Sequence, residues 1–243
     1  SAHSSATSIA LSPFISVRLH CCKISRKPVL KRCSYRGSRM TLENKLGLTE
    51  AAELARAEEK LSKAKAALLF EQGLLDTLPT GTFAGLAAIH QFLFEDIYPF
   101  AGQMRHVNIS KGQFRFASVL YLADALRRID RMPQGSFDEI VEKYVEMNVA
   151  HPFREGNGRS ARIWLDAMLK KELGVVVDWS GIDREAYLQA MERSPVNDAE
   201  IKDLLKKALT DQVNDRTVYM KGIDASYHYE GYHIFRTEDL SRN

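Results

Sequence analysis

Apolar residues recur along most of this chain at the spacing expected of helices. Over residues 49–75 the sequence is rich in Ala, Leu, Glu and Lys, which are strong helix formers. Over residues 83–98 the apolar positions again share one face, and Pro99 predicts the end of that helix. That face carries Leu86, Ile89, His90, Leu93 and Phe94. The same periodicity predicts further helices over residues 120–132, 137–149, 159–173, 184–193, 198–209 and 215–229.

Residues 102–117 break the helical pattern. Residues that favour β-structure stand on both sides of a Lys111-Gly112 turn, and this arrangement predicts a short hairpin. Taken alone, such a hairpin is more often an ordinary surface ribbon than a functional element. The sequence therefore predicts a mainly α fold with one β-hairpin.

Charge is unevenly distributed along the chain. The 243 residues include 34 Lys and Arg against 31 Asp and Glu, which gives a formal net charge of +3. Residues 1–39 contain eight of the basic residues and no acidic residue, so residues 40–243 carry a net charge of −5. The body of the chain is thus acidic, and only residues 1–39 could serve as a basic arm for nucleic acid. No run approaches the roughly 18 uninterrupted apolar residues that a membrane-spanning helix needs.

Residues 1–39 are predicted to be a disordered extension outside the fold, or translated upstream sequence. Their nine serines and eight basic residues also resemble an organellar transit peptide, the main alternative to a cytoplasmic location. A nucleic-acid arm is less favoured, because no aromatic base-stacking pattern accompanies the basic residues. Cys21, Cys22 and Cys33 lie in this extension, and no His or carboxylate pattern completes a zinc site around them.

The sequence HPFREGNGRSAR, residues 151–162, contains most of the candidate chemistry. His151 follows a predicted helix that the next residue, a proline, cannot continue, so its imidazole is expected at a helix–loop junction as a base. Gly156, Asn157 and Gly158 form a tight turn that opens into the next helix. Glycines let backbone N–H groups approach an anion closely, and the start of a helix favours negative charge.

Charged residues complete this candidate site. Glu155 supplies a hard oxygen ligand suited to Mg²⁺ shared with phosphates. Arg159 and Arg162 are three positions apart, so both are expected on one helix face, where two guanidinium groups suit a polyphosphate. Each feature alone is more often structural. Together, within twelve residues, they indicate phosphoryl-type transfer by positioning and charge neutralisation.

These residues match the motif of the Fic family, His-x-Phe-x-Asp/Glu-Gly-Asn-Gly-Arg-x-x-Arg, at every specified position. Residues 98–105, 108–117 and 188–198 also resemble Fic segments, and the resemblance covers about residues 70–232. It implies a helical bundle with a β-hairpin flap, and transfer of AMP from ATP to a hydroxyl group of a target protein. Kinase-like relatives replace the first motif glycine by Ala and the second by Lys. This chain keeps both Gly156 and Gly158, which favours AMP transfer.

The resemblance also implies a role for each motif residue. His151 would deprotonate the target hydroxyl, Phe153 would anchor the loop in the core, and Glu155 would bind Mg²⁺. The phosphates of ATP would be held by Gly156, Asn157, Gly158, Arg159 and Arg162. A target segment would add as a strand to the flap, a mode that reads backbone more than side chains. The flap residues are Asn108, Ile109, Ser110, Lys111, Gly112, Phe114 and Phe116.

Residues 226–231, SYHYEG, resemble the inhibitory motif of the family, Ser/Thr-x-x-x-Glu-Gly/Asn. Ser226 and Glu230 are four positions apart and so share a helix face, and Gly231 completes the motif. The resemblance implies that Glu230 pairs with Arg162 and occupies the guanidinium that should bind the γ-phosphate. AMP added to a nearby tyrosine would clash with the docked helix and release it, although aromatic residues at this spacing are more often packing residues. The candidate self-modification sites are Tyr227, Tyr229 and Tyr232.

The leading hypothesis is an ATP- and Mg²⁺-dependent protein adenylyltransferase that inhibits itself. Residues 40–215 would form the catalytic domain, and residues 216–243 the inhibitory helix and tail. One alternative is removal of AMP from a modified protein, with Glu230 positioning the attacking water. Another is a nucleotide-binding regulatory module without turnover, which the intact His151 argues against. Expected partners are ATP and a target protein at the flap. A homo-oligomer remains open, and neither a membrane nor a nucleic acid is expected.

Overall fold

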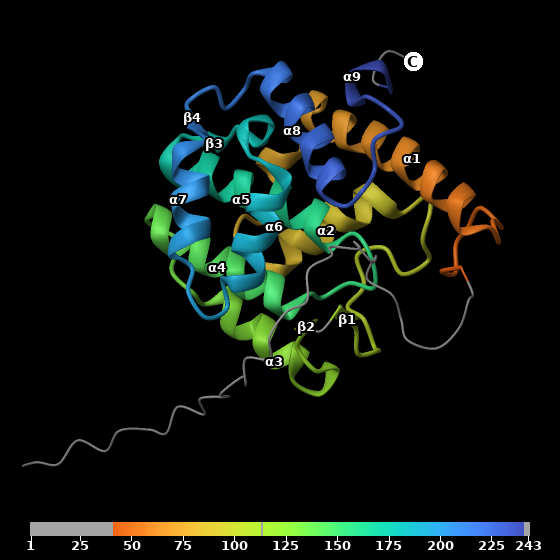
Figure 1. Cartoon of the computed structure of the whole chain (residues 1–243), viewed down its shortest axis with the longest axis horizontal. Coiled ribbons are helices and arrows are strands. Elements are labelled where there is room, and N and C mark those ends of the chain that lie inside the picture. Colours follow the sequence, from red (N-terminus) through yellow and green to blue (C-terminus); the bar gives the residue numbers. More distant parts are fainter. Residues whose placement is uncertain (1–40, 113, 241–243) are drawn as a thin grey trace, which may run out of the picture. The chain divides into compact units, whose positions relative to one another are not determined.

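The computed structural model describes residues 41–112 and 114–240 of the chain (Figure 1). The predictions for residues 1–39 lie outside the described residues. Helices make up most of the described chain, as the periodicity predicts. They are α1 (Ala51–Glu71), α2 (Phe83–Phe94), α3 (Val119–Asp130), α4 (Phe137–Ala150), α5 (Asn157–Leu173), α6 (Arg184–Arg193), α7 (Ala199–Lys207), α8 (Arg216–Tyr229) and α9 (Thr237–Leu240), with short 3₁₀ turns η1 (Leu74–Thr77) and η2 (Trp179–Gly181).

Local signals explain where several helices begin and end. The Thr82 hydroxyl accepts a hydrogen bond from the backbone N–H of Gly85 and so caps the start of α2. Ser136 and Glu139 form a capping box at the start of α4. Helix α1 ends at Glu71, a few residues before its predicted end, because Gly73 adopts a left-handed φ of 64° and turns the chain into η1.

The predicted continuation of the second helix to residue 98 is wrong. Helix α2 ends at Phe94, and the backbone N–H groups of Ile97 and Tyr98 both donate to the Phe94 carbonyl in a non-helical turn. Both side chains are nevertheless buried. These two residues continue the apolar pattern because they are buried, although the helix has already ended at Phe94.

Two short antiparallel strand pairs accompany the helices. Strands β1 (Ser110–Lys111) and β2 (Phe114–Arg115) form the predicted hairpin, with Ser110 opposite Arg115 and Lys111 opposite Phe114. Strand β3 (Val176–Val177) pairs with β4 (Leu209–Thr210), and the sequence did not predict this second pair. This second pair joins the segment before α6 to the segment after α7. The mainly α fold class with a hairpin is confirmed.

Helix α5 is the element that positions the site. It packs against α2, α4 and α8 (Figure 1). Trp164, Leu165 and Met168 of this helix are buried within the hydrophobic core cluster. Because Arg159 and Arg162 lie on the same buried helix, the fold carries two guanidinium groups into its interior. Of the helices within the described residues, none is long and apolar enough to cross a membrane.

Candidate active site

His151 stands where α4 ends. It caps the helix with a left-handed φ of 50°, and among the described residues it alone has a positive φ without being a glycine. Such a conformation is strained in a residue with a side chain and is found most often at functional sites. The imidazole Nδ1 lies 3.2 Å from the Asn148 carbonyl oxygen, and the ring stacks on Phe116 at a centroid distance of 3.6 Å.

These contacts set the protonation state of His151. A carbonyl oxygen only accepts, so Nδ1 carries the proton and Nε2 carries the lone pair. Burial, together with the positive charges of Lys111 and Arg105, lowers the pKa of His151 to about 3. The ring is therefore neutral at physiological pH and able to accept a proton through Nε2.

The loop after His151 is held by side chains that reach back to its backbone. Phe153 is fully buried. The Asn157 side chain accepts from the Phe153 N–H and donates to the Phe153 carbonyl, both at 2.8 Å. Arg105, which precedes the flap, donates to the carbonyls of His151, Ala150, Ala117 and Val107. Arg105 thus fastens the base of the flap to the end of α4, a role that the sequence did not reveal.

His90 supports the loop from α2. Its ring stacks on Phe153 at 3.8 Å, its Nε2 lies 2.8 Å from the Glu155 carbonyl, and its Nδ1 accepts from the Gly102 N–H at 2.9 Å. These two bonds require a neutral ring with the proton on Nε2. Burial, together with the nearby charge of Arg159, lowers the pKa of His90 to about 3.

This buried neutral histidine predicts a loss of stability in mild acid. The unfolded chain takes up a proton near the ordinary pKa of 6.5, whereas folded His90 does so only near 3. Its stabilising contribution is complete above pH 6.5 and is lost as the pH falls towards 3. We expect His90→Gln to make the free energy of unfolding depend less steeply on pH between 6.5 and 5, by about one proton. Urea unfolding at several pH values measures this slope, and His106→Gln, at an exposed position, is the matched control. Equal slopes for the two variants would contradict the conclusion that folded His90 stays neutral.

The start of α5 is shaped to receive an anion. Gly156 caps the helix with φ 78°, and a Cβ atom there would lie 2.5 Å from the Phe94 ring. A Cβ atom on Gly158 would lie 2.3 Å from Oε1 of Glu230. Gly156 is therefore required by both conformation and space, whereas the absence of a side chain at Gly158 leaves the space that the Glu230 carboxylate occupies. The Glu230 carboxylate lies over the N-terminus of α5, where unpaired N–H groups and the helix dipole favour negative charge.

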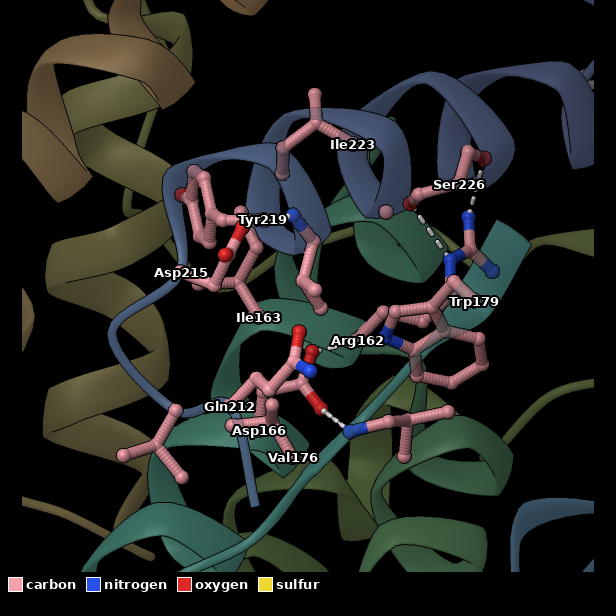
Figure 2. Close-up of a pocket in the computed structure, with 14 residues that line it drawn as sticks. Arg162, Ile163, Asp166, Val176, Trp179, Gln212, Asp215, Tyr219, Ile223 and Ser226 are labelled. Atoms are coloured by element: carbon pink, nitrogen blue, oxygen red, sulfur yellow. Dashed lines mark hydrogen bonds between the residues drawn. The ribbon is translucent and has the colours of Figure 1, made fainter. Parts of the chain in front are cut away.

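Arg162 binds this carboxylate from within α5. Its Nη2 donates to Oε1 of Glu230 at 3.1 Å and to the Ser226 carbonyl at 2.8 Å. Its Nε donates to the Ser226 hydroxyl at 2.7 Å, and its Nη1 donates to the Tyr187 hydroxyl at 3.2 Å. Figure 2 shows the guanidinium turned towards Ser226 on α8. The predicted contact between Arg162 and the segment around Ser226 and Glu230 is thus present in the structure.

Three cations stabilise the charge of Glu230. Burial alone would raise the pKa of this carboxyl group. The positive charges of Lys111, Arg162 and Arg159 instead hold that pKa well below its ordinary value. Lys111 belongs to the flap, and its Nζ lies 3.3 Å from Oε2 of Glu230. The two carboxylate oxygens are therefore shared between α5 and the flap.

Arg159 has a different environment from Arg162. It donates to Glu58 of α1 and, at 3.1 Å, to Oε1 of Glu155. The buried Glu58 carboxylate thus gives Arg159 an ion-pair partner that Arg162 does not have, and the expectation that both arginines bind the phosphates of ATP stays a prediction. The sequence could not reveal this pair, since 101 positions separate its members. The Nε–H of Arg159 is buried and has no hydrogen-bond partner among the described residues.

Buried charges on α1 also bind the chain that follows Glu230. Glu58 accepts a hydrogen bond of 2.6 Å from the Tyr232 hydroxyl. Glu59 accepts from the backbone N–H groups of Ile234 at 2.9 Å and Phe235 at 3.1 Å. Lys63 donates to the Phe235 carbonyl at 2.6 Å. The chain that follows Glu230 is thereby fixed to α1.

The candidate self-modification tyrosines are all buried in this arrangement. Tyr227 and Tyr229 are almost fully enclosed, and Tyr232 is 8% exposed. The Tyr229 hydroxyl donates to the carbonyls of Trp179 and Ile182, and the Tyr232 hydroxyl is bound by Glu58. None of the three is accessible while α8 is docked, so their modification stays a prediction that requires release of the segment.

Glu155 is the residue that could hold a metal ion. Its side chain is 23% exposed, and the hydrogen bonds from Arg159 and Gly156 both go to Oε1. Burial and the neighbouring Glu58 raise its pKa, so a divalent cation would relieve an unfavourable negative charge. Within the described part of the chain, no group of three or more His, Cys, Asp or Glu residues could hold a metal. Glu155 could thus contribute one carboxylate ligand to a divalent cation.

The site as a whole combines a neutral histidine with an anion-binding helix terminus inside a helical bundle. This combination defines a class of proteins that can bind phosphate groups beside a base. Within the chain, residues 82–169 match the Fic/DOC family. The probable protein adenylyltransferase Fic of Salmonella typhimurium is 32% identical over 183 residues, covering 70% of this chain and 88% of that protein. The chain belongs to the Fic/DOC family.

Further similarities agree with this assignment. The probable protein adenylyltransferase Fic of Escherichia coli is 30% identical over 168 residues, covering 65% of this chain and 81% of that protein. The crystal structure of BepC, a VirB-translocated effector of Bartonella tribocorum with bound AMPPNP, matches with a TM-score of 0.59 at 21% identity. That match covers 73% of this chain and 96% of that chain, and it shows that the two share a fold.

Proposed function

We propose that this protein transfers AMP from ATP to a hydroxyl side chain of a target protein. One observation carries the proposal: the Glu230 carboxylate lies over Gly158 at the N-terminus of α5 and is bound by Arg162, so this place is built to hold an anion. The histidine base stands at the other end of the same loop. The relatives named as protein adenylyltransferases, and the AMPPNP bound by BepC, support ATP as the substrate.

In the proposed reaction, Nε2 of neutral His151 accepts the proton of the target hydroxyl. The hydroxyl oxygen then forms a bond to the α-phosphorus of ATP. The bond from the α-phosphorus to the oxygen that bridges to the β-phosphorus breaks, and pyrophosphate leaves. The backbone N–H groups from Gly156 to Gly158 hold the phosphates, and Arg162 neutralises their charge. Glu155 would hold Mg²⁺, which supplies charge neutralisation on the phosphates.

We further propose that Glu230 inhibits this reaction. Its carboxylate takes up the guanidinium of Arg162 and the space above Gly158. ATP would then have to displace the carboxylate or bind with its phosphates in another position. Residues 40–215 would form the catalytic domain and residues 216–243 the inhibitory helix and tail. Release of α8 would also expose Tyr227, Tyr229 and Tyr232 to modification.

The target protein is proposed to dock on the flap. The hairpin reaches the catalytic loop directly, because Phe116 stacks on His151. An extended target segment pairing with β1 or β2 would present its hydroxyl group beside this ring. Recognition through the backbone would allow the hydroxyl to come from Tyr, Thr or Ser.

Two labelled forms of ATP test which group is transferred. Relative to a cell lysate alone, we expect added Glu230→Gly protein to increase labelling of protein from the α-phosphorus of ATP but not from the γ-phosphorus, because the γ-phosphate leaves in pyrophosphate. Gel autoradiography measures both. Label arriving from the γ-position would show phosphate transfer instead and would contradict the proposed function.

A further inference from the structure

Lys111 is the cation that the flap contributes to the anion-binding site at the start of α5, where the Glu230 carboxylate lies. Its Nζ lies 3.3 Å from Oε2 of Glu230, while Arg162 binds Oε1 of the same carboxylate at 3.1 Å. The Glu230 side chain is 23% exposed and that of Lys111 is 33% exposed. The carboxylate therefore bridges two elements that are otherwise separate in sequence, the hairpin and α5.

The same geometry accommodates a phosphate group in place of the carboxylate. Phosphate oxygens that replace Oε1 and Oε2 would meet Arg162 on one side and Lys111 on the other. Arg159 already forms ion pairs with Glu58 and Glu155, whereas Glu230 is the carboxylate that Lys111 and Arg162 share. A lysine ammonium is a compact charge with three donors, which suits the terminal phosphates of a nucleotide.

We propose that Lys111 binds the β- or γ-phosphate of ATP once Glu230 has withdrawn, and so positions the leaving pyrophosphate. This inference rests on the proposed function, because it takes ATP as the anion that replaces the carboxylate. Lys111 then serves as a positioning residue with two alternative partners, Glu230 in the inhibited protein and the nucleotide in the active one.

Equilibrium binding of ATP and AMP tests this role without requiring turnover. In the Glu230→Gly protein, Lys111→Met should weaken ATP binding about tenfold, which corresponds to about 1.4 kcal/mol, because the phosphates lose one charged donor. AMP lacks the β- and γ-phosphates, so its affinity should stay within about twofold by the same reasoning. Lys111→Arg keeps the charge and should restore most of the ATP affinity. Isothermal titration calorimetry measures these ATP and AMP affinities, and Lys207→Met at an exposed position of α7 is the control.

The outcomes separate this inference from the proposed function. Unchanged ATP affinity in Lys111→Met, or equal losses for ATP and AMP, would overturn the role of Lys111. A raised KM for the target protein with unchanged ATP affinity would place Lys111 at the target instead. If ATP binding depends on Lys111 as expected but no AMP is transferred, the nucleotide role stands and the proposed reaction fails.

Discussion

Replacing Glu230 by glycine is expected to raise the rate of AMP transfer by roughly 10- to 100-fold. The substitution removes the carboxylate that Arg162 and Lys111 bind and empties the space above Gly158. Hydrogen bonds to charged groups contribute roughly 1.5–3 kcal/mol each, and about 1.4 kcal/mol corresponds to a factor of ten. Transfer of α-phosphorus label from ATP, followed over time for both proteins, measures the increase.

Two further variants make this result specific to the carboxylate. Glu230→Gln keeps the size of the side chain but removes its charge, so its rate should lie between those of the wild-type and glycine proteins. Glu43→Gly makes the same chemical change at an exposed loop position and should leave the rate unchanged. If Glu230→Gly is no faster than the wild-type protein, the inhibitory role of Glu230 is wrong.

Replacing His151 is expected to reduce transfer about 10²- to 10⁴-fold, the usual contribution of a general base. Asn is the most informative substitute, because it tolerates the left-handed backbone at this position but cannot act as the base. ATP affinity should change by less than about twofold, since the phosphates are held by the start of α5 and by Arg162. The measurement pairs a transfer assay with calorimetry, both in the Glu230→Gly background.

The same pair of measurements excludes a purely structural role for His151. His151 caps α4 and stacks on Phe116, so a variant could fail through misfolding of the loop. Preserved ATP affinity and an unchanged melting temperature would show that the loop is intact. Transfer that continues at the parental rate in His151→Asn would contradict the assignment of the base.

The sequence predicted the parts of the site that are close together in the chain. The histidine at the end of α4 and the hairpin around Gly112 depend on local chemistry and are present, with Lys111 as the last residue of β1. The predicted start of α5 near Arg159 is wrong, because the helix begins at Asn157 and only Gly156 of the glycine turn precedes it. The contact between Arg162 and Glu230 spans 68 positions, and only the resemblance to Fic proteins indicated it. Local pattern alone would have left α8 as an ordinary packing helix.

The parts that the sequence did not predict depend on contacts between distant segments. The composition of α1 is typical of a solvent-exposed helix, yet Glu58, Glu59 and Lys63 are buried because the C-terminal segment lies across them. Strands β3 and β4 have two residues each, too few for an alternating pattern to be visible. The end of α2 was missed because Ile97 and Tyr98 remain buried after the helix has stopped.

In the proposed enzyme, Glu230 holds a histidine-dependent AMP transfer inactive. The most direct test measures α-phosphorus label transferred from ATP to protein by three chains side by side: wild type, Glu230→Gly, and Glu230→Gly combined with His151→Asn. We expect little label from the wild-type chain, strong labelling from the single variant, and a return to little label in the double variant. Equal labelling by all three chains, or by the single and double variants, would contradict it.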